Sequence, residues 1–334
     1  MGSVVSHRWW RCVAVVLTAI GFFSLTFHAA AKAPMQKNQA PGFYRMMLGR
    51  FEVTALCDGL LEADPTALKN ITPSDVKKLL ARSLIFDFRP VPISTNAYLV
   101  NTGDKLVLID AGGGSSLLSG LGGLQQALKA SGYKPEQVDA VLITHLHGDH
   151  FAGLIDANGK PAFPNATVYI SKTEHDHWFG DTEPKDVPKE YLDYFRGIRK
   201  RVRDTADAYR KLGHWKVFAD AKLPIAGFQP IATPGHTPGH TSYEIESDGR
   251  RLLFLGDIIH FGPVQFPRPD VYVFDANPKQ AVASREALFR RVADGKTLVA
   301  GMHLPFPGIG RLRADGKNAY GWIPIDYSPV LNVK

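Results

Sequence analysis

The sequence predicts an α+β fold in which two β-sheets pack face to face and helices cover the outside. The predicted elements follow the order strand, strand, helix, strand, and this order occurs twice along the 334 residues. Each half also contains an apolar strand that leads to an aspartate, "KLVLIDAG" at 105–112 and "RLLFLGDI" at 251–258. This recurrence is faint by itself, so the fold class depends mainly on the order of the elements.

The first 31 residues have the layout of a secretory signal peptide. "MGSVVSHRWWR" carries Arg8 and Arg11 and no acid, an apolar run follows, and "HAAAK" offers small residues for cleavage after Ala31. An uncleaved membrane anchor is the alternative, because the apolar run is near the short end of what can span a bilayer. We expect cleavage, a secreted or periplasmic protein, and no stable membrane anchor afterwards.

Residues 32–334 are predicted to form a single domain. Hydrophobic residues make up 45% of the chain and charged residues 21%, which is ordinary for a globular enzyme. The basic run "RGIRKRVR" at 196–203 lacks interleaved aromatic residues for base stacking, so we expect no nucleic-acid partner. Cys57 is the one cysteine outside the leader, so no intramolecular disulfide can form.

The first half of this domain contains strands around two short helices. A strand is predicted at 50–59, a helix at 73–83 with Ser74 as its cap, and a hairpin at 95–112 that turns at 101–103. A glycine-rich loop at 112–116 leads to a helix at 121–132, with Gly132 as the stop signal. Branched apolar residues predict a short buried strand at 138–145 and another that begins at 166.

The segment 172–222 differs from the rest, because it is helical in pattern, charged and rich in aromatic residues. We interpret it as an insertion or cap and not as a separate domain, since no linker-like composition flanks it. Strands are predicted again at 228–235, 241–247, 250–259 and 297–303, with a helix at 277–294 between the last two.

Metal-capable side chains gather where these strands end or turn. Such positions are held by a rigid core while their side chains converge on a cleft. The candidate ligands are His145, His147, Asp149, His150, His236, Asp257 and His303, and Asp110 ends one further strand. One metal needs about four ligands, and a catalytic zinc keeps one position open for water, so five histidines and two carboxylates suit two ions that share a carboxylate. Imidazole and carboxylate without thiolate suit zinc, iron, cobalt or manganese.

The motifs "HLHGDH", "GHTPGH" and "LGDI", with a late histidine at a strand end, resemble the metallo-β-lactamase superfamily. The resemblance implies an αβ/βα four-layer sandwich that holds two divalent ions, with zinc favoured over manganese, cobalt or iron. One ion would take His145, His147 and His236, the other would take Asp149, His150 and His303, and Asp257 would bridge them. Asp110 and His240 would support these ligands without binding metal.

A narrower resemblance covers nearly all of the mature chain. "PGFYRMMLGRFEVTALCDG" and "HLPFPGIGRLRADGK" are similar to methyl parathion hydrolase and the exported lactonases related to it. The superfamily's true β-lactamases lack the bridging aspartate, so Asp257 argues against that activity, and export argues against glyoxalase II. On related proteins alone, a homodimer through "GFYRMMLG" at 42–49 is expected.

Three functions remain open: a lactonase for acyl-homoserine or aromatic lactones, an organophosphate triesterase with the same site, and an exported metal-binding protein without hydrolytic activity. In either hydrolase, a bridging hydroxide would attack a small-molecule substrate, and Asp149 or a metal-bound water would return a proton to the leaving group. His260 would either donate to the substrate or be a satisfied structural histidine. An apolar wall of Phe274, Trp178 and Phe179 beside His260 favours a lactone.

Overall fold

The computed structural model describes residues 33, 35–87, 89–114, 119–180, 192–219, 222–293, 295, 297–328 and 331. The predicted signal peptide at 1–31 lies outside these residues, as do 181–191, 220 and 221 of the predicted insertion. The chain divides into one unit that ends at Ala40 and a second, Pro41–Lys334, which contains every helix and strand described. Within the described residues, no helix has the length and apolar character needed to cross a membrane.

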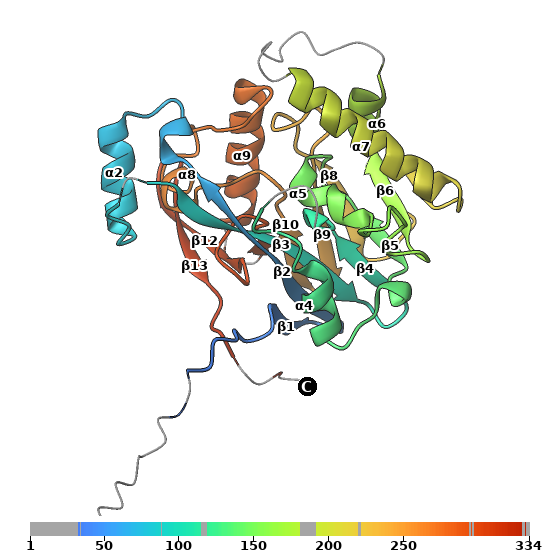
Figure 1. Ribbon diagram of the computed structural model, residues 1–334. Helices are drawn as coiled ribbons and strands as arrows, with labels where there is room; N and C mark the ends of the chain where they lie inside the picture. Colours follow the sequence, from blue (N-terminus) through green and yellow to red (C-terminus); the bar gives the residue numbers. More distant parts are fainter. Residues whose placement is uncertain are drawn as a thin grey trace, which may run out of the picture. The chain divides into compact units, whose positions relative to one another are not determined.

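Two mixed β-sheets form the centre of the second unit (Figure 1). The strands of the first sheet, in spatial order, are β1 (Phe43–Leu48), β2 (Phe51–Ala63), β3 (Val91–Asn101), β4 (Leu106–Ile109), β5 (Ala140–Leu142), β6 (Thr167–Ser171) and β7 (Trp215–Phe218). Those of the second are β13 (Ala319–Pro324), β12 (Ile309–Gly316), β11 (Thr297–Ala300), β10 (Arg250–Phe254), β9 (Thr241–Ser247) and β8 (Phe228–Ala232). β4 to β7 run parallel, as do β10 and β11, and the other neighbours are antiparallel.

The helices cover the outer faces of the two sheets. The α-helices are α2 (Pro73–Arg82), α4 (Leu124–Ala130), α5 (Gly148–Phe151), α6 (Lys172–Phe179), α7 (Leu192–Arg210), α8 (Gly262–Gln265) and α9 (Pro278–Val292). Short 3₁₀ helices occur at η1 (Pro65–Ala67), η2 (Pro135–Gln137) and η3 (Ala152–Leu154). Residues of α4, α6 and α7 share a core with the first sheet, and residues of α9 share one with the second.

Side chains of the central strands point alternately to the two faces of each sheet, and this alternation explains the layers of helix and sheet. In β4, Leu108 belongs to the core beneath α4 and α7, whereas Val107 belongs to the core between the sheets. In β10, Leu253 faces α9 while Phe254 faces the first sheet. Because successive side chains of a strand point to opposite faces, each sheet buries both of its faces. The predicted four-layer α+β sandwich is therefore confirmed.

Two predicted boundaries are wrong. The cap of α2 is Thr72, whose Oγ1 accepts from the Asp75 N–H at 3.2 Å, and not Ser74. Pro73 occupies the first helical position, where its missing N–H costs nothing, so the cap is the residue before it, two positions earlier than predicted. The strand predicted to stop at 59 continues as β2 to Ala63, because the register shifts at a bulge between Cys57 and Gly59.

The segment 172–222 is not helical throughout. Its described residues form α6 and α7 but also β7, which extends the first sheet by pairing parallel with β6. α7 packs its buried Ile198, Val202 and Tyr209 against the core of that sheet, at the spacing of one helical face. The strands β1, β12 and β13 were also not predicted.

Candidate metal centre

The predicted ligands lie at the carboxyl ends of strands. His145 follows β5, and Asp110 directly follows the neighbouring parallel strand β4. Asp257 follows β10, and His303 follows its parallel neighbour β11. Side chains from the ends of parallel neighbours meet at one edge of a sheet, and the two sheets bring their edges together here.

Asp257 lies between two groups of these ligands. Its Oδ2 is 3.5 Å from His145 Nε2 and 3.2 Å from His236 Nε2. Its Oδ1 is 3.1 Å from His150 Nε2 and 3.2 Å from His303 Nε2. One carboxylate therefore presents a different oxygen to each group, which is the arrangement needed to bridge two ions.

All seven predicted ligands fall into sets that could hold a metal ion, with the ligand atoms of each set within 4.8 Å of one another. The sets are His145, His147, His236 and Asp257; Asp149, His150 and His303; and Asp257, His260 and His303. The first two correspond to the sets that the family resemblance implies for the two ions, with Asp257 joined to the first. The third adds His260, which the sequence did not assign as a ligand.

The donor atoms of this cluster fit a bound cation. Nε2 of His145, Nε2 of His150 and Oδ1 of Asp257 are buried and make no hydrogen bond to any residue that the structure describes. Buried polar atoms are nearly always hydrogen-bonded, so unsatisfied atoms that point at one another require an explanation. A divalent ion between imidazole and carboxylate groups supplies it.

The other ring nitrogens are held by neighbours that orient the imidazoles. His150 Nδ1 is 2.8 Å from Asp110 Oδ2, and His303 Nδ1 is 2.9 Å from the carbonyl oxygen of Ser94. His236 Nδ1 is 3.2 Å from Asp275 Oδ1. Acceptors in these positions keep the proton on Nδ1 and leave Nε2 free for metal.

Asp110 has a strained backbone at this site. Its φ is 59°, a conformation that non-glycine residues rarely adopt. Its carboxylate accepts from the Thr144 backbone N–H at 2.8 Å and from Thr144 Oγ1 at 2.9 Å, in addition to its contact with His150. Asp110 thus holds the start of the "HLHGDH" segment as well as one ligand, consistent with its predicted supporting place.

His240 supports Asp257 through the backbone. Its Nε2 accepts from the Asp257 N–H at 2.9 Å, and its Nδ1 is 2.8 Å from Thr233 Oγ1. Burial lowers the pKa of His240 to about 3, so the ring is neutral and able to accept. Both nitrogens are occupied, so His240 lies where the sequence predicted it, beside the ligands and not among them.

Burial and mutual contacts set the charges of the cluster. Burial lowers the pKa of His147 to about 3 and that of His145 well below its usual value, so both rings are neutral, as metal ligands must be. Burial opposes the charged form of Asp257, but His150 and His303 hold its pKa well below the usual range. Burial likewise opposes the cationic form of His150, yet Asp257 and Asp149 hold its pKa well above its usual value. Negative charge therefore exceeds positive charge around His150.

His260 and Phe274 lie together at the edge of the cluster. His260 Nε2 is 3.1 Å from Asp257 Oδ2, and its Nδ1 is buried without a hydrogen-bond partner among the described residues. Phe274 meets the His260 ring edge-on, with 5.6 Å between centroids, and is 56% exposed. Its φ of 58° is strained for an aromatic residue. Phe274 therefore presents an apolar face to solvent beside the metal ligands.

The two predicted cap aromatics occupy different places. Trp178 is 3% exposed, lies edge-on to the His147 ring at 6.0 Å and stacks on Phe195. Phe179 stacks on His175 at 4.2 Å and lies beneath the Arg210 guanidinium. The structure thus brings Trp178 behind a ligand, within the core, and does not bring Phe179 to the cluster.

Three supporting residues were missed by sequence reasoning. Asp275 contacts His236, and the fully buried Arg285 contacts Asp275 Oδ2 at 3.5 Å and donates to the carbonyl oxygen of Ile258 at 2.5 Å. Glu174, also fully buried, accepts from the backbone N–H of Leu146 at 2.9 Å. None of them lies in a recognisable motif, so no local signal in the sequence singles them out.

Comparison with known proteins identifies similar chains. A family model described as the metallo-beta-lactamase superfamily matches residues 90–303. A crystal structure of the hydrolase AbOPH in the beta lactamase superfamily is 40% identical, covers 87% of this chain and 100% of its own, and superposes with a TM-score of 0.83. AidC, a dizinc quorum-quenching lactonase, is 28% identical over 86% of this chain and 98% of its own, with a TM-score of 0.79. An N-acyl homoserine lactonase of Bacillus cereus is 30% identical over 128 residues, 38% of this chain and 41% of that protein.

Proposed function

The chain belongs to the metallo-beta-lactamase superfamily, and from this we propose that it is a dinuclear-metal hydrolase that opens lactone rings. One observation carries the proposal. Asp257 directs one carboxylate oxygen to His145 and His236 and the other to His150 and His303, all at 3.1–3.5 Å. Such a site supports hydrolysis without a serine or cysteine nucleophile.

His145, His147 and His236 would hold one ion, Asp149, His150 and His303 the other, and Asp257 would lie between them. When bound, two divalent ions lower the pKa of water towards neutrality and polarise a carbonyl oxygen. Asp110, Asp275 and the Ser94 carbonyl hold the imidazoles of His150, His236 and His303 in one orientation, with the proton on Nδ1. This orientation is in place before a substrate arrives.

Two further side chains would act on the substrate. Asp149 Oδ2 lies 3.4 Å from both His150 Nε2 and His303 Nε2, and its side chain is 14% exposed, so it can exchange a proton with a leaving alkoxide. The unpartnered Nδ1 of His260 is a site for a hydrogen bond to the polar edge of a bound molecule. The ring ester of a lactone, with its carbonyl oxygen and ring oxygen, is a polar edge of this kind.

The proposed substrate class is supported by the difference in polarity between His260 and Phe274. A polar imidazole next to an exposed aromatic face suits a molecule with one polar edge and one apolar side, as in an acyl-homoserine or aromatic lactone. AidC and the lactonase of Bacillus cereus support this choice, because both are lactonases with similar sequences. A phosphotriester places charge on similar oxygens during attack, and it is therefore the alternative that the experiment must separate.

The test is to measure metal content and hydrolysis on one preparation of purified protein. We expect about two zinc ions per chain and a higher kcat/KM for a homoserine lactone or an aryl lactone than for a dimethyl aryl phosphotriester. Two metals with dominant phosphotriester turnover would overturn the substrate class. Bound metal with neither activity would favour the exported metal-binding protein.

Export through the leader at 1–31 and a dimer through residues 42–49 stay predictions. Fractionation of cells that express the full chain tests the first: the protein is expected outside the cytoplasm, shortened at its N-terminus. Analytical ultracentrifugation of the purified protein tests the second.

A further inference from the structure

The buried carboxylate of Glu174, on α6, takes no part in the reaction proposed above. Its side chain is 0% exposed, and both of its oxygens accept hydrogen bonds. Oε1 accepts from the Leu146 backbone N–H at 2.9 Å and from Trp178 Nε1 at 2.7 Å. Oε2 accepts from Thr237 Oγ1 at 2.6 Å and from the Gly239 backbone N–H at 3.1 Å.

Three of these donors belong to the two loops that carry the histidines of the first set, and the fourth, Trp178, lies on α6 itself. Leu146 lies between His145 and His147, and Thr237 directly follows His236. Glu174 therefore connects the two chain segments whose histidines must meet at one ion. Their approach is close, since His236 Nε2 lies 2.9 Å from His147 Nδ1.

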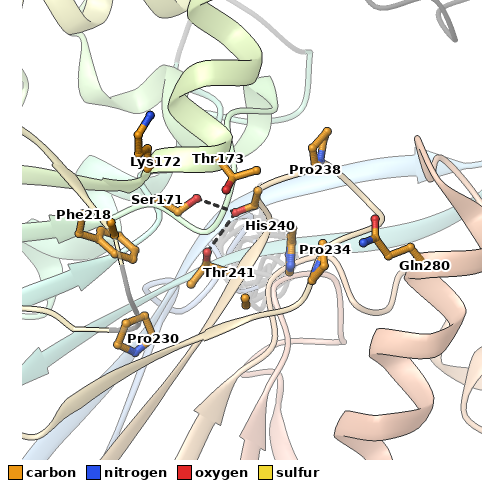
Figure 2. A pocket seen from close by; sticks show the side chains of 13 residues that line it. Ser171, Lys172, Thr173, Phe218, Pro230, Pro234, Pro238, His240, Thr241 and Gln280 are labelled. Atoms are coloured by element: carbon orange, nitrogen blue, oxygen red, sulfur yellow. Dashed lines mark hydrogen bonds between the residues drawn. The ribbon is translucent and has the colours of Figure 1, made fainter.

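The loop that carries His236 depends on α6 for its position. The hydroxyl groups of Ser171 and Thr241 both donate to the Gly239 carbonyl oxygen, at 2.8 and 3.0 Å, and Figure 2 shows the two side chains converging on it. A Cβ on Gly239 would lie 2.0 Å from the Glu174 backbone nitrogen, so the loop and the helix are in direct contact. On another side the loop borders a cavity of about 460 Å³, lined by Pro234 and Pro238, which gives it little support there.

We propose that Glu174 is a positioning residue that sets the spacing of the two loops, and thereby the metal affinity of the set His145, His147 and His236. In the second set, Asp149, His150 and His303, no residue donates a hydrogen bond to Glu174 among the hydrogen bonds described. Loss of Glu174 therefore weakens one metal position selectively. The inference rests on the proposed metal centre and is independent of the substrate.

A carboxylate is required at this place because it accepts only. Four donors face the two oxygens of Glu174, and an ionised carboxylate can accept from all of them. A glutamine of the same shape would turn its NH₂ group either towards the N–H groups of Leu146 and Trp178 or towards the Gly239 N–H. None of these groups can accept, so their hydrogen bonds would be lost. Glu174→Gln thus removes the connection to one loop without creating a cavity.

The experiment measures zinc affinity by competition with a chromophoric chelator, in the full chain. Glu174→Gln is compared with Glu244→Gln, a second buried carboxylate, which lies on β9 and contacts Arg291 at 2.7 Å. Replacement of a residue that orients a metal ligand typically weakens metal binding about 10- to 100-fold. We expect such a loss at one of two positions for Glu174→Gln and none for Glu244→Gln.

Two variants that each keep only one intact ligand set show which metal position Glu174 affects. His303→Asn leaves the first set intact, and His236→Asn leaves the second set intact. Glu174→Gln is expected to weaken zinc binding about 10- to 100-fold in the His303→Asn background and to leave it unchanged in the His236→Asn background. A purely structural role would lower the melting temperature without this asymmetry.

A smaller substitution keeps the proposal testable if Glu174→Gln does not fold. Thr237→Val removes one donor to Glu174 and keeps the shape of the side chain, so it should weaken the same position to a smaller degree. Equal losses in both backgrounds, or zinc affinity unchanged in both, would overturn the inference while leaving the metal centre standing. Absence of zinc binding by the unmodified protein would instead overturn the proposed function.

Discussion

His240 and Asp257 are joined by a hydrogen bond of 2.9 Å in which the imidazole Nε2 of His240 accepts from the backbone N–H of Asp257. This contact requires glycine at position 256. Gly256 has a φ of 61°, and a Cβ there would lie 2.3 Å from His240 Nε2. The motifs "GHTPGH" and "LGDI" are therefore in direct contact through His240 and Asp257, which are 17 residues apart.

Gly256→Ala is expected to be more destabilising than Gly249→Ala. Both glycines have positive φ, but nothing lies within 4 Å of a Cβ at Gly249. Gly249→Ala should lower the free energy of unfolding by about 1 kcal/mol, the cost of the backbone conformation. Gly256→Ala should cost about 1–3 kcal/mol more, because the ring of His240 must move. Denaturant unfolding measures both, and equal costs would contradict the contact.

Asp110→Asn should weaken metal binding and activity together. The amide retains the shape of Asp110 but loses the negative charge that orients His150 at 2.8 Å. We expect zinc affinity or kcat/KM to fall about 10- to 100-fold. Asp139→Asn, at a half-buried carboxylate that accepts from the Leu106 N–H, is the matched control and should change neither. Wild-type zinc affinity and kcat/KM in Asp110→Asn would refute this role.

Substitutions of Phe274 should change stability and activity independently. Phe274→Gly relieves a strained φ of 58° that costs about 1–3 kcal/mol, whereas Phe274→Ala keeps the strain. Both variants remove the exposed ring and should lower kcat/KM for a long-chain acyl-homoserine lactone about tenfold or more. Only Phe274→Gly should be as stable as the unmodified protein, measured by thermal unfolding. A large loss of stability in Phe274→Gly would indicate that the ring is part of the core.

Metal removal should lower stability as well as abolish hydrolysis. Zinc that binds only the folded state stabilises it by about 4 kcal/mol at a concentration 1,000 times its Kd. We therefore expect the melting temperature to fall after chelation and to recover when zinc is returned. A chain with both His236→Asn and His303→Asn should show a much smaller response. An unchanged melting temperature after complete chelation would argue against a bound metal.

The order of strands and helices could be predicted because each long element carries its own pattern. β4, β5 and β10 are apolar runs ended by polar residues, and α9 begins at Pro278 behind the cap Asn277. The strands that were missed lie at or near sheet edges. In β7 and β13 several side chains are exposed or half-buried, so no clear alternation marks them.

The sequence by itself determined the order of the central strands along the chain and which side chains lie at the ends of these strands. Both follow from local chemistry, since hydrophobic period, turn residues and ligand spacing are written within a few neighbouring positions. Only the tertiary structure decided that Glu174 joins two ligand loops, that Asp275 orients His236, and that Trp178 is buried. The reason is that these contacts connect segments far apart in the chain, such as Glu174 and Thr237, 63 residues away. Their geometry is set by how helices pack on the sheets, which no local pattern records.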